Sequence, residues 1–255
     1  MIELNRLFLR RDTTQILDDV SLTINKGEHW VILGKNGSGK TSILEMVNGY
    51  LFPSSGTVSV LGNMYGQVDV REMRKKIGYI SQSLMDKMAL RDPVWEVVAT
   101  GEYGYLRFYE EIPEWLQNKA HRMLEFVKLE HRAGHVLGTL SQGERKKAML
   151  ARALMSDPEI LIMDEPCSGL DLYEREHLLA AINDLHQKNA AVVYVTHHIE
   201  EIMPVFTHVA LLEQGRLVAA GPKHEVLTVE NLHKAYQIPV SLEWSSDRPW
   251  IRVLS

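Results

Sequence analysis

The chain has 255 residues, of which 45% are hydrophobic and 24% charged, and its formal net charge is −5 at pH 7. These totals predict one large globular domain, or one domain with an embedded subdomain, and they give no overall basic field to attract nucleic acid, so no nucleic-acid partner is expected. The single cysteine, Cys167, excludes an internal disulfide and a cysteine-rich zinc site, which indicates a reducing compartment.

The N-terminal stretch MIELNRLFLRRD has charges scattered through it and no apolar core before a cleavage site. It is therefore not predicted to be a secretory signal. No apolar run approaches the roughly 18 residues needed to span a bilayer. We expect a soluble, cytosolic chain, so that any role at a membrane needs a partner.

The first third of the chain reads as short strands, and 20–25 (VSLTIN) alternates apolar and polar residues as a half-buried strand does. The runs HWVILG, ILIMD and AAVVYVTH are continuously apolar, which is typical of parallel strands covered on both faces. Helical stretches lie between the strands, for example at 41–48 and 173–188. Strands that alternate with helices predict an α/β protein with a parallel sheet.

From about residue 84 to 138 the chain is rich in helix formers and lacks a convincing strand, which predicts an inserted helical subdomain over about 84–158. The main domain is predicted to span 1–221. From about Pro222 to 255 we expect a small appendage, a helix followed by a strand pair that ends RPWIRVLS. An excess of aromatic side chains lies within the helical insert: Trp95, Tyr103, Tyr105, Phe108 and Tyr109.

The stretch GKNGSGKTS, residues 34–42, matches G-x-x-x-x-G-K-[ST] between an apolar strand and a helical run. Glycines let backbone N–H groups converge on phosphate oxygens, and the helix N-terminus adds the positive end of its dipole. Lys40 is predicted to reach the terminal phosphates and Thr41 to ligate Mg²⁺. The alternative is a merely flexible glycine loop. The predicted nucleotide-binding residues here are Gly34, Lys35, Asn36, Gly37, Ser38, Gly39, Lys40, Thr41 and Ser42.

The stretch ILIMDEPCSGLD, residues 160–171, ends a buried strand with two adjacent carboxylates. Desolvating two like charges is costly unless a cation or a proton-transfer task holds them there. In phosphate-loop NTPases an acidic residue in this place holds Mg²⁺, a role that Asp164 fits, and Glu165 can accept a proton from the attacking water. The alternative is that Asp164 only caps the next segment and Glu165 is solvated.

Together these motifs resemble the nucleotide-binding domains of ABC (ATP-binding cassette) proteins over about residues 2–221. The resemblance implies an α/β P-loop NTPase fold with a mostly parallel central sheet, an N-terminal antiparallel β subdomain and an inserted helical subdomain. It also implies ATP and Mg²⁺ as cofactors. Residues 34–41 resemble the Walker A loop and 160–165 Walker B. Further resemblances are Gln82 to the Q-loop glutamine, which contacts nucleotide and metal, LSQGE (140–144) to the signature, Asp171 to the D-loop aspartate and His197 to the switch histidine.

The chain departs from the family pattern in two places. Its signature has Gln142 where glycine is usual and Glu144 where glutamine is usual, although Ser141 and Gly143 are intact. Ser141 and Glu144 also fit a capping box that opens the following helix, and both roles can hold because a capped helix N-terminus is an anion site as well. In the second departure, Arg10 and Arg11 stand where the family stacks adenine on an aromatic ring. An arginine can stack on a base, and Phe8 is a remoter candidate, so ATP rather than GTP follows from the resemblance alone.

The resemblance further implies a head-to-tail pair, a homodimer or a pairing with a related cassette, in which Ser141 and Gly143 of one copy complete the site of the other. Glu165 would polarise water while Lys40, Mg²⁺ and His197 stabilise charge. The leading function is the energising subunit of a membrane transporter, peripheral on the inner face of the membrane, with separate transmembrane subunits. The aromatic cluster at 95–109 is a docking face or a subdomain core. The alternative is a soluble ABC ATPase of the iron–sulfur cluster assembly type, which Glu144 and the ERKK run slightly resemble.

Overall fold

The computed structural model describes residues 1–187 and 189–254. The chain forms two compact units, the first made of Met1–Arg74 with Ala191–Ser255 and the second of Lys75–Ala190. The ends of the predicted helix 173–188 and of the predicted tail, Lys188 and Ser255, lie outside the described residues. The proposed boundaries at 84–158 and 221/222 remain predictions.

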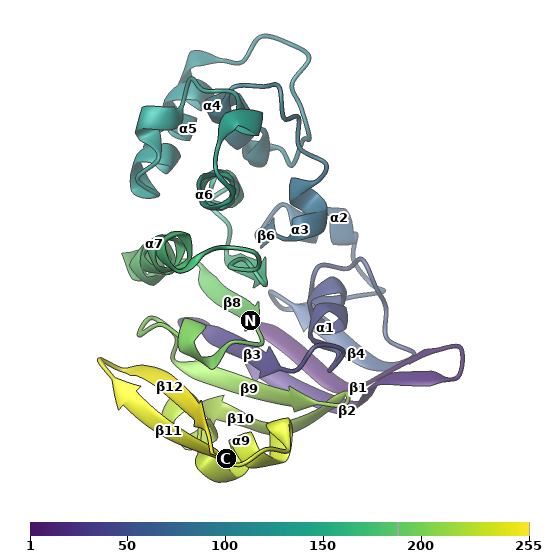
Figure 1. The fold of residues 1–255 in the computed structure, drawn as a ribbon. Coiled ribbons are helices and arrows are strands. Elements are labelled where there is room, and N and C mark those ends of the chain that lie inside the picture. The colour runs from purple at the N-terminus through teal and green to yellow at the C-terminus, as the bar shows by residue number, and fades with distance from the viewer. Residues whose placement is uncertain (188, 255) are drawn as a thin grey trace. The chain divides into compact units, whose positions relative to one another are not determined.

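An antiparallel sheet of the order β2-β1-β4-β5 forms one part of the first unit (Figure 1). In β2 the residues Val20, Leu22 and Ile24 are buried and those between them are exposed, which confirms the alternation read from the sequence. The strands of this sheet are β1 (Ile2–Arg11), β2 (Thr14–Ile24), β4 (Ser55–Val60) and β5 (Asn63–Met64).

The second layer of this unit is the strand set β10-β9-β3-β8, in which β3 lies parallel to β8 and β9, and β10 antiparallel to β9. Every residue of β3 and β8 is buried, as their continuous apolar runs predict. The strands are β3 (Trp30–Gly34), β8 (Ala191–Thr196), β9 (His208–Glu213) and β10 (Arg216–Pro222). In this unit α1 (Lys40–Val47) follows β3, α2 (Val70–Arg74) follows β5, and the 3-10 turn η5 (Ile199–Glu201) connects β8 to β9.

The tail folds within the first unit. Two short helices, α8 (Lys223–Val226) and α9 (Val229–Tyr236), are followed by an antiparallel hairpin of β11 (Val240–Ser245) and β12 (Arg248–Val253), drawn in yellow in Figure 1. The helix and strand pair predicted from the sequence are thus present, with one more helix than expected.

The second unit contains one parallel strand pair and a group of helices. The pair is β6 (Ile77–Ile80) and β7 (Ile160–Asp164), in register from Ile77↔Ile160 to Ile80↔Met163. Between them α4 (Val94–Ala99), α5 (Glu114–Phe126) and α6 (Gln142–Leu154) pack together. The remaining elements are α3 (Gln82–Met85), η1 (Thr100–Glu102), η2 (Glu130–Arg132), η3 (Leu137–Thr139), α7 (Leu172–Asn183) and η4 (Asp184–Gln187).

Parallel pairing in both units, helices between the strands and the N-terminal antiparallel sheet confirm the predicted α/β class. Two predicted helices begin one residue earlier than expected: 41–48 corresponds to α1, and 173–188 to α7 followed by η4. No described helix is both long and apolar enough to cross a bilayer.

Candidate nucleotide-binding site

The predicted phosphate loop joins β3 to α1 in the first unit. Gly34 ends β3 so close to β9 that a Cβ there would lie 2.3 Å from the Leu212 carbonyl oxygen. Gly37 and Gly39 adopt φ values of +79° and +103°, which side chains disfavour. The Ser38 amide closes the turn on the Lys35 carbonyl at 3.2 Å. Glycine is therefore needed here for close approach at one end and for backbone turning at the other.

Lys40 lies beneath this loop and is only 5% exposed. Its Nζ donates to the carbonyls of Gly34 at 2.8 Å and Lys35 at 3.0 Å, which holds the ammonium inside the turn. Ser38 is also buried, and its hydroxyl has no hydrogen-bond partner among the described residues. A buried, unpartnered hydroxyl is uncommon in folded proteins, and a phosphate oxygen is a partner that it could use.

The start of α1 is open to an anion. Its N-cap is Gly39, which has no side chain to accept a hydrogen bond from the first amides of the helix. Thr41 is exposed at this end and Ser42 is half-buried. At the tip of the loop Asn36 and Gly37 are exposed, while Lys35 forms an ion pair with Glu213 at 2.8 Å. The predicted set from 34 to 42 thus covers the end of β3, the loop and the first residues of α1.

The predicted switch histidine lies at the same edge of the sheet as this loop. Leu33 of β3 is in parallel register with Thr196 of β8. Gly34, the last residue of β3, and His197, the residue after β8, therefore both lie at the carboxyl ends of paired strands. This edge is where open α/β sheets bind ligands. His197 is half-buried, and its ring lies against that of His198 with the centroids 4.0 Å apart and the ring planes tilted by 41°.

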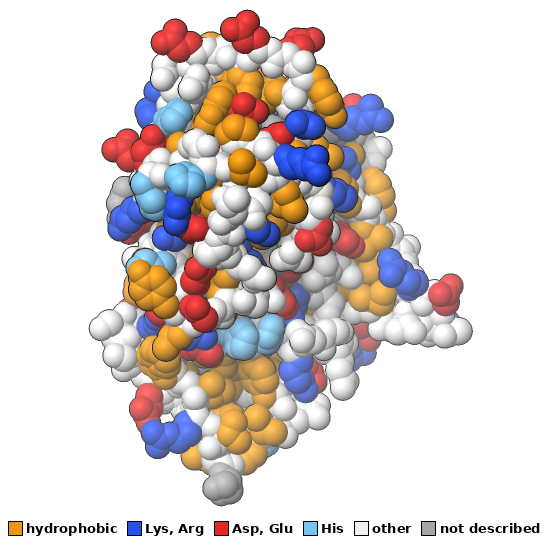
Figure 2. Space-filling view, turned by 45° about the horizontal axis from the view of Figure 1, so that its top comes forward, with side chains coloured by type: hydrophobic (Ala, Val, Ile, Leu, Met, Phe, Trp, Pro, Cys, Tyr) orange, Lys and Arg blue, Asp and Glu red, His pale blue; other side chains and the backbone are white. Residues whose placement is uncertain are grey.

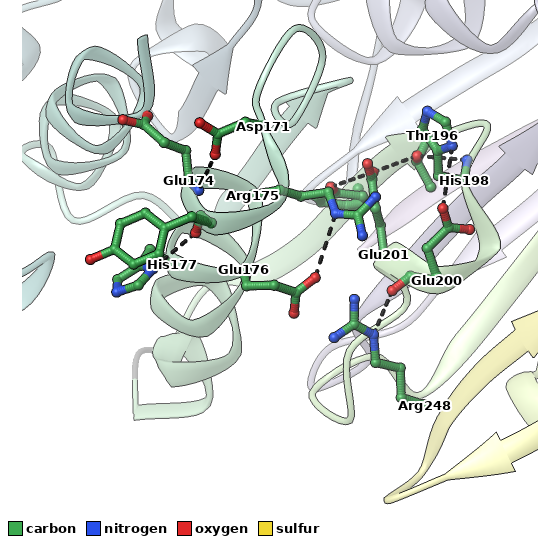
Figure 3. A network of polar contacts seen from close by, with 12 residues as sticks. Asp171, Glu174, Arg175, Glu176, His177, Thr196, His198, Glu200, Glu201 and Arg248 are labelled. Carbon is green, nitrogen blue, oxygen red and sulfur yellow. Dashed lines mark hydrogen bonds and ion pairs between the residues drawn. The ribbon is translucent and has the colours of Figure 1, made fainter. Parts of the chain in front are cut away.

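A buried carboxylate that the sequence analysis missed lies just beyond His197. Glu201 is 3% exposed, and its Oε2 accepts a hydrogen bond from the Tyr194 hydroxyl at 2.8 Å. It also accepts one from the Thr196 hydroxyl at 2.6 Å (Figure 3). The sequence signal was a glutamate four residues after His197, with the apolar residues Ile199 and Ile202 nearby in the chain.

In the second unit the acidic strand end takes the form that the sequence predicted. Residues 160–163 of β7 are buried and Asp164 is half-buried at its end. Glu165 follows with φ of +44°, a left-handed backbone conformation that non-glycine residues rarely adopt. Cys167 is 4% exposed and packs in the following turn.

Gln82 lies at the same edge of this strand pair as the two carboxylates, because Ile80 of β6 is in register with Met163 of β7. It begins α3, whose N-cap Ser81 accepts the Leu84 amide at 3.3 Å. The Gln82 side chain is exposed, and its Nε2 donates to Asp86 Oδ1 at 2.8 Å. The predicted glutamine and carboxylates thus lie at the same end of this strand pair.

The signature segment forms a complete capping box at the start of α6. The Ser141 hydroxyl accepts the Glu144 amide at 3.1 Å, and Glu144 Oε2 accepts the Ser141 amide at 2.9 Å. Arg132 Nε donates to the other Glu144 oxygen at 2.8 Å. Burial acts to raise the pKa of Glu144, but the Ser141 amide and the Arg132 guanidinium outweigh it and hold that pKa below its ordinary value. These local bonds therefore account for a glutamate at position 144, where the family usually has glutamine.

The start of α6 packs closely on the segment that follows β7. A Cβ on Gly143 would lie 1.6 Å from Glu174 Oε2 of α7, and one on Gly169 would lie 3.2 Å from Gln142 Oε1. Lys146 Nζ donates to the Ser168 carbonyl at 2.7 Å. Asp171 caps α7 by accepting the Glu174 amide at 2.9 Å (Figure 3), a structural task that the sequence analysis did not assign to it.

The region predicted to meet the base has no aromatic platform at the expected positions. Arg10 and Arg11 are exposed at the end of β1, and Arg10 Nε donates to the Asp12 carbonyl at 3.1 Å. Phe8 is half-buried and lines an open cavity of about 450 Å³ with Asp18, Asp19, Ser21, Arg216 and Leu217. The base-stacking residue remains a prediction.

A glycine loop over a buried lysine between a strand and a helix, in a chain that also carries an acidic strand end, defines a P-loop nucleotide-binding protein. The family model described as ABC transporter matches residues 17–168. An uncharacterised ABC transporter ATP-binding protein of Bacillus subtilis, YlmA, is 39% identical over 98% of this chain and 96% of its own length. The chain therefore belongs to the ABC transporter ATP-binding proteins.

Solved structures share the fold. One is from a putative metal-chelate type ABC transporter in an inward-facing conformation, with a TM-score of 0.78, 23% identity and coverage of 99% of this chain and 96% of that one. Another is a dimeric cassette in a post-hydrolysis state bound to ADP and phosphate, with a TM-score of 0.75, 24% identity and coverage of 87% and 98%. Family and fold together make the chain an ATP-binding, ATP-hydrolysing cassette of a membrane transporter.

Proposed function

We propose that two copies of this chain, or one copy and a related cassette, close on Mg²⁺–ATP and drive separate transmembrane subunits from the inner face of the membrane. The observation that carries the proposal is the 34–42 loop, in which buried Lys40 supports a turn that ends at an uncapped helix start. Such a loop matches a triphosphate, since it offers converging amides and a positive charge.

The metal would be held by Thr41, Gln82 and Asp164. These residues offer hydroxyl, amide and carboxylate oxygens, the hard donors that Mg²⁺ prefers. No group of three or more histidine, cysteine or acidic residues capable of holding a metal occurs among the described residues. A site with so few protein ligands suits Mg²⁺, which usually keeps several waters and binds through the phosphates of its substrate.

For catalysis we assign the general base to Glu165 and charge stabilisation to Lys40 and His197. Mg²⁺ would neutralise developing charge on the phosphoryl oxygens when it is bound. The left-handed backbone at Glu165 is the kind of strain that is found at functional sites. His197 would contact the γ-phosphate.

Dimerisation would bring Ser141, Gln142, Gly143 and Glu144 of one copy onto the nucleotide of the other, with Asp171 nearby. Support comes from the capped start of α6, an anion site whose N-cap hydroxyl is already oriented by Glu144. Directly after Asp171, Leu172 and Tyr173 are 67% and 71% exposed. Large apolar side chains at such exposure are typical of surfaces that a partner covers, and a solved relative in fold is itself a dimer.

The transmembrane partner would dock on the aromatic part of the second unit. Tyr103, Tyr105 and Tyr109 are 50%, 52% and 90% exposed, and Phe108 packs edge-on against the first two. Hydrophobic side chains reach the surface over this region in the upper part of Figure 2. Exposed aromatic residues favour a docking face over a subdomain core. No observation favours the iron–sulfur alternative, because the capping box accounts for Glu144.

The purified chain with Mg²⁺–ATP tests this assignment. Glu165→Gln is expected to lower phosphate release by roughly 10²–10⁴-fold, the usual loss when general acid–base help is removed, while nucleotide binding persists. Lys40→Ala is expected to weaken binding of the triphosphate itself. Fluorescent-nucleotide titration and a phosphate-release assay separate the two effects. Wild-type turnover in both variants would contradict the proposed site.

A further inference from the structure

The C-terminal hairpin contacts the segment that follows the switch histidine (Figure 3). Arg248, the first residue of β12, donates from Nε to the backbone carbonyl of Glu200 in η5 at 2.5 Å. The same guanidinium lies 4.9 Å over the ring of Trp250. A planar, charged donor held on one side by an aromatic ring makes a strong and directional hydrogen bond.

The hairpin is anchored at its turn, directly before Arg248. Ser246 and Asp247 have φ values of +50° and +61°, as the two central residues of a tight hairpin turn require. Lys223, whose side chain is 6% exposed, donates to Asp247 Oδ2 at 2.5 Å, and His224 Nε2 lies 2.7 Å from Oδ1 of the same carboxylate. The bonds to Asp247 therefore hold the backbone from which the Arg248 side chain extends.

On its other side η5 is tied to the backbone around His197. The Thr196 hydroxyl accepts the His198 amide at 3.0 Å and donates to Glu201 Oε2 at 2.6 Å. The Thr196 hydroxyl thus links both sequence neighbours of His197, Thr196 itself and His198, to the Glu201 carboxylate in η5. Thr196 and Glu201 are 1% and 3% exposed, so water does not compete for these bonds.

We propose that Arg248 is a positioning residue for His197. By holding the Glu200 carbonyl it fixes η5, and through Glu201 and Thr196 it fixes the backbone on both sides of the imidazole. The hairpin, here called the brace, then holds His197 in its catalytic position. The tail therefore affects the turnover rate without contacting the nucleotide. This inference rests on the proposed contact of His197 with the γ-phosphate.

The test compares Arg248→Met with Arg252→Met. Arg252 lies on the same strand and the same face but is exposed and four residues further along. Arg248→Met is expected to lower kcat by roughly 3- to 10-fold, less than the ~10²-fold that a 1 Å misplacement can cost. KM for ATP should stay unchanged, because the phosphate loop is intact. Arg252→Met should keep both wild-type values.

NMR of histidine-labelled protein measures the surroundings of His197 directly. A contribution of Arg248 to stability alone would not change the His197 resonance. The His197 side-chain resonance, identified by its loss in His197→Ala, is expected to shift in Arg248→Met and to stay in place in Arg252→Met. Thermal unfolding checks that both variants are folded. Should Arg248→Met fail to fold, Arg248→Lys takes its place, since it keeps the charge but loses the planar Nε donor, and the same shift is expected.

The outcomes separate this inference from the proposed function. If His197→Ala loses turnover while the Arg248 variant matches wild type in kcat and in the His197 resonance, the brace is wrong and the site stands. If His197→Ala retains turnover, the proposed role of His197 fails, and the inference fails with it. A fall in kcat with an equal rise in KM would show a general loss of structure and would also overturn the brace.

Discussion

Gly34 and Gly37 of the phosphate loop are required for different physical reasons, and substituting each by alanine distinguishes the two reasons. At Gly34 a Cβ would meet the Leu212 carbonyl at 2.3 Å, and this backbone atom cannot move without parting β3 from β9. At Gly37 the space around a Cβ is open within 4 Å, but φ is +79°. The first position is limited by contact and the second by conformation.

We therefore expect Gly34→Ala to lower the free energy of unfolding by roughly 2–3 kcal/mol, as overpacking does, and Gly37→Ala by about 1 kcal/mol, the cost of one strained residue. Urea unfolding of the nucleotide-free chain measures both. Gly134 has neither a close neighbour nor a positive φ, so Gly134→Ala is the matched control and should not destabilise. Equal losses at 34 and 37 would contradict the packing described for β3.

At the scale of the element, the start of α6 depends on the ionised form of Glu144. Its pKa in the folded chain is lowered, so the stability that it contributes is present above its unfolded pKa, about 4.3. That contribution is lost as pH falls through the lower, folded value. Protonation weakens both the bond from the Ser141 amide and the ion pair with Arg132.

Glu144→Gln tests this dependence because it keeps the shape and removes the charge. The variant is expected to be less stable than wild type at pH 7. The gap should narrow as pH falls below the unfolded pKa and close below the lower, folded pKa, where the wild-type carboxylate is protonated as well. Urea unfolding at the two pH values measures the gap. Glu111→Gln, at an exposed loop position, is the control and should differ little from wild type at either pH. A gap that stays constant with pH would refute the charged cap.

At the scale of the whole molecule, a head-to-tail pair predicts that two damaged chains can repair each other. Lys40→Ala damages the phosphate loop. Ser141→Asp keeps the N-cap of α6, since aspartate caps as well as serine, but points a negative charge at the partner's phosphates. Each variant alone should have almost no turnover, whereas a heterodimer of the two contains one intact composite site and one doubly damaged site.

Mixing equal amounts makes half of the dimers heterodimers if the chains pair at random, so turnover per chain should return to about a quarter of wild type for symmetric two-site dimers. Phosphate release from the mixture, compared with each variant alone at the same total concentration, measures the recovery. A mixture as inactive as its components, although Ser141→Asp still binds nucleotide, would mean that each chain completes its own site.

The sequence by itself determined the α/β class, the phosphate loop, the acidic strand end and the capping box, because each depends on residues within a few positions of one another and on local backbone rules. The loop needs glycine, lysine and threonine at fixed spacing, and the cap needs Ser141 and Glu144 three residues apart. Only the tertiary structure decided what holds these pieces in place. The bond of Arg248 to the Glu200 carbonyl joins residues 48 apart, and the close approach of Glu174 to Gly143 joins two separate helices. No local pattern encodes such contacts, since they arise when the chain packs and brings distant side chains into reach.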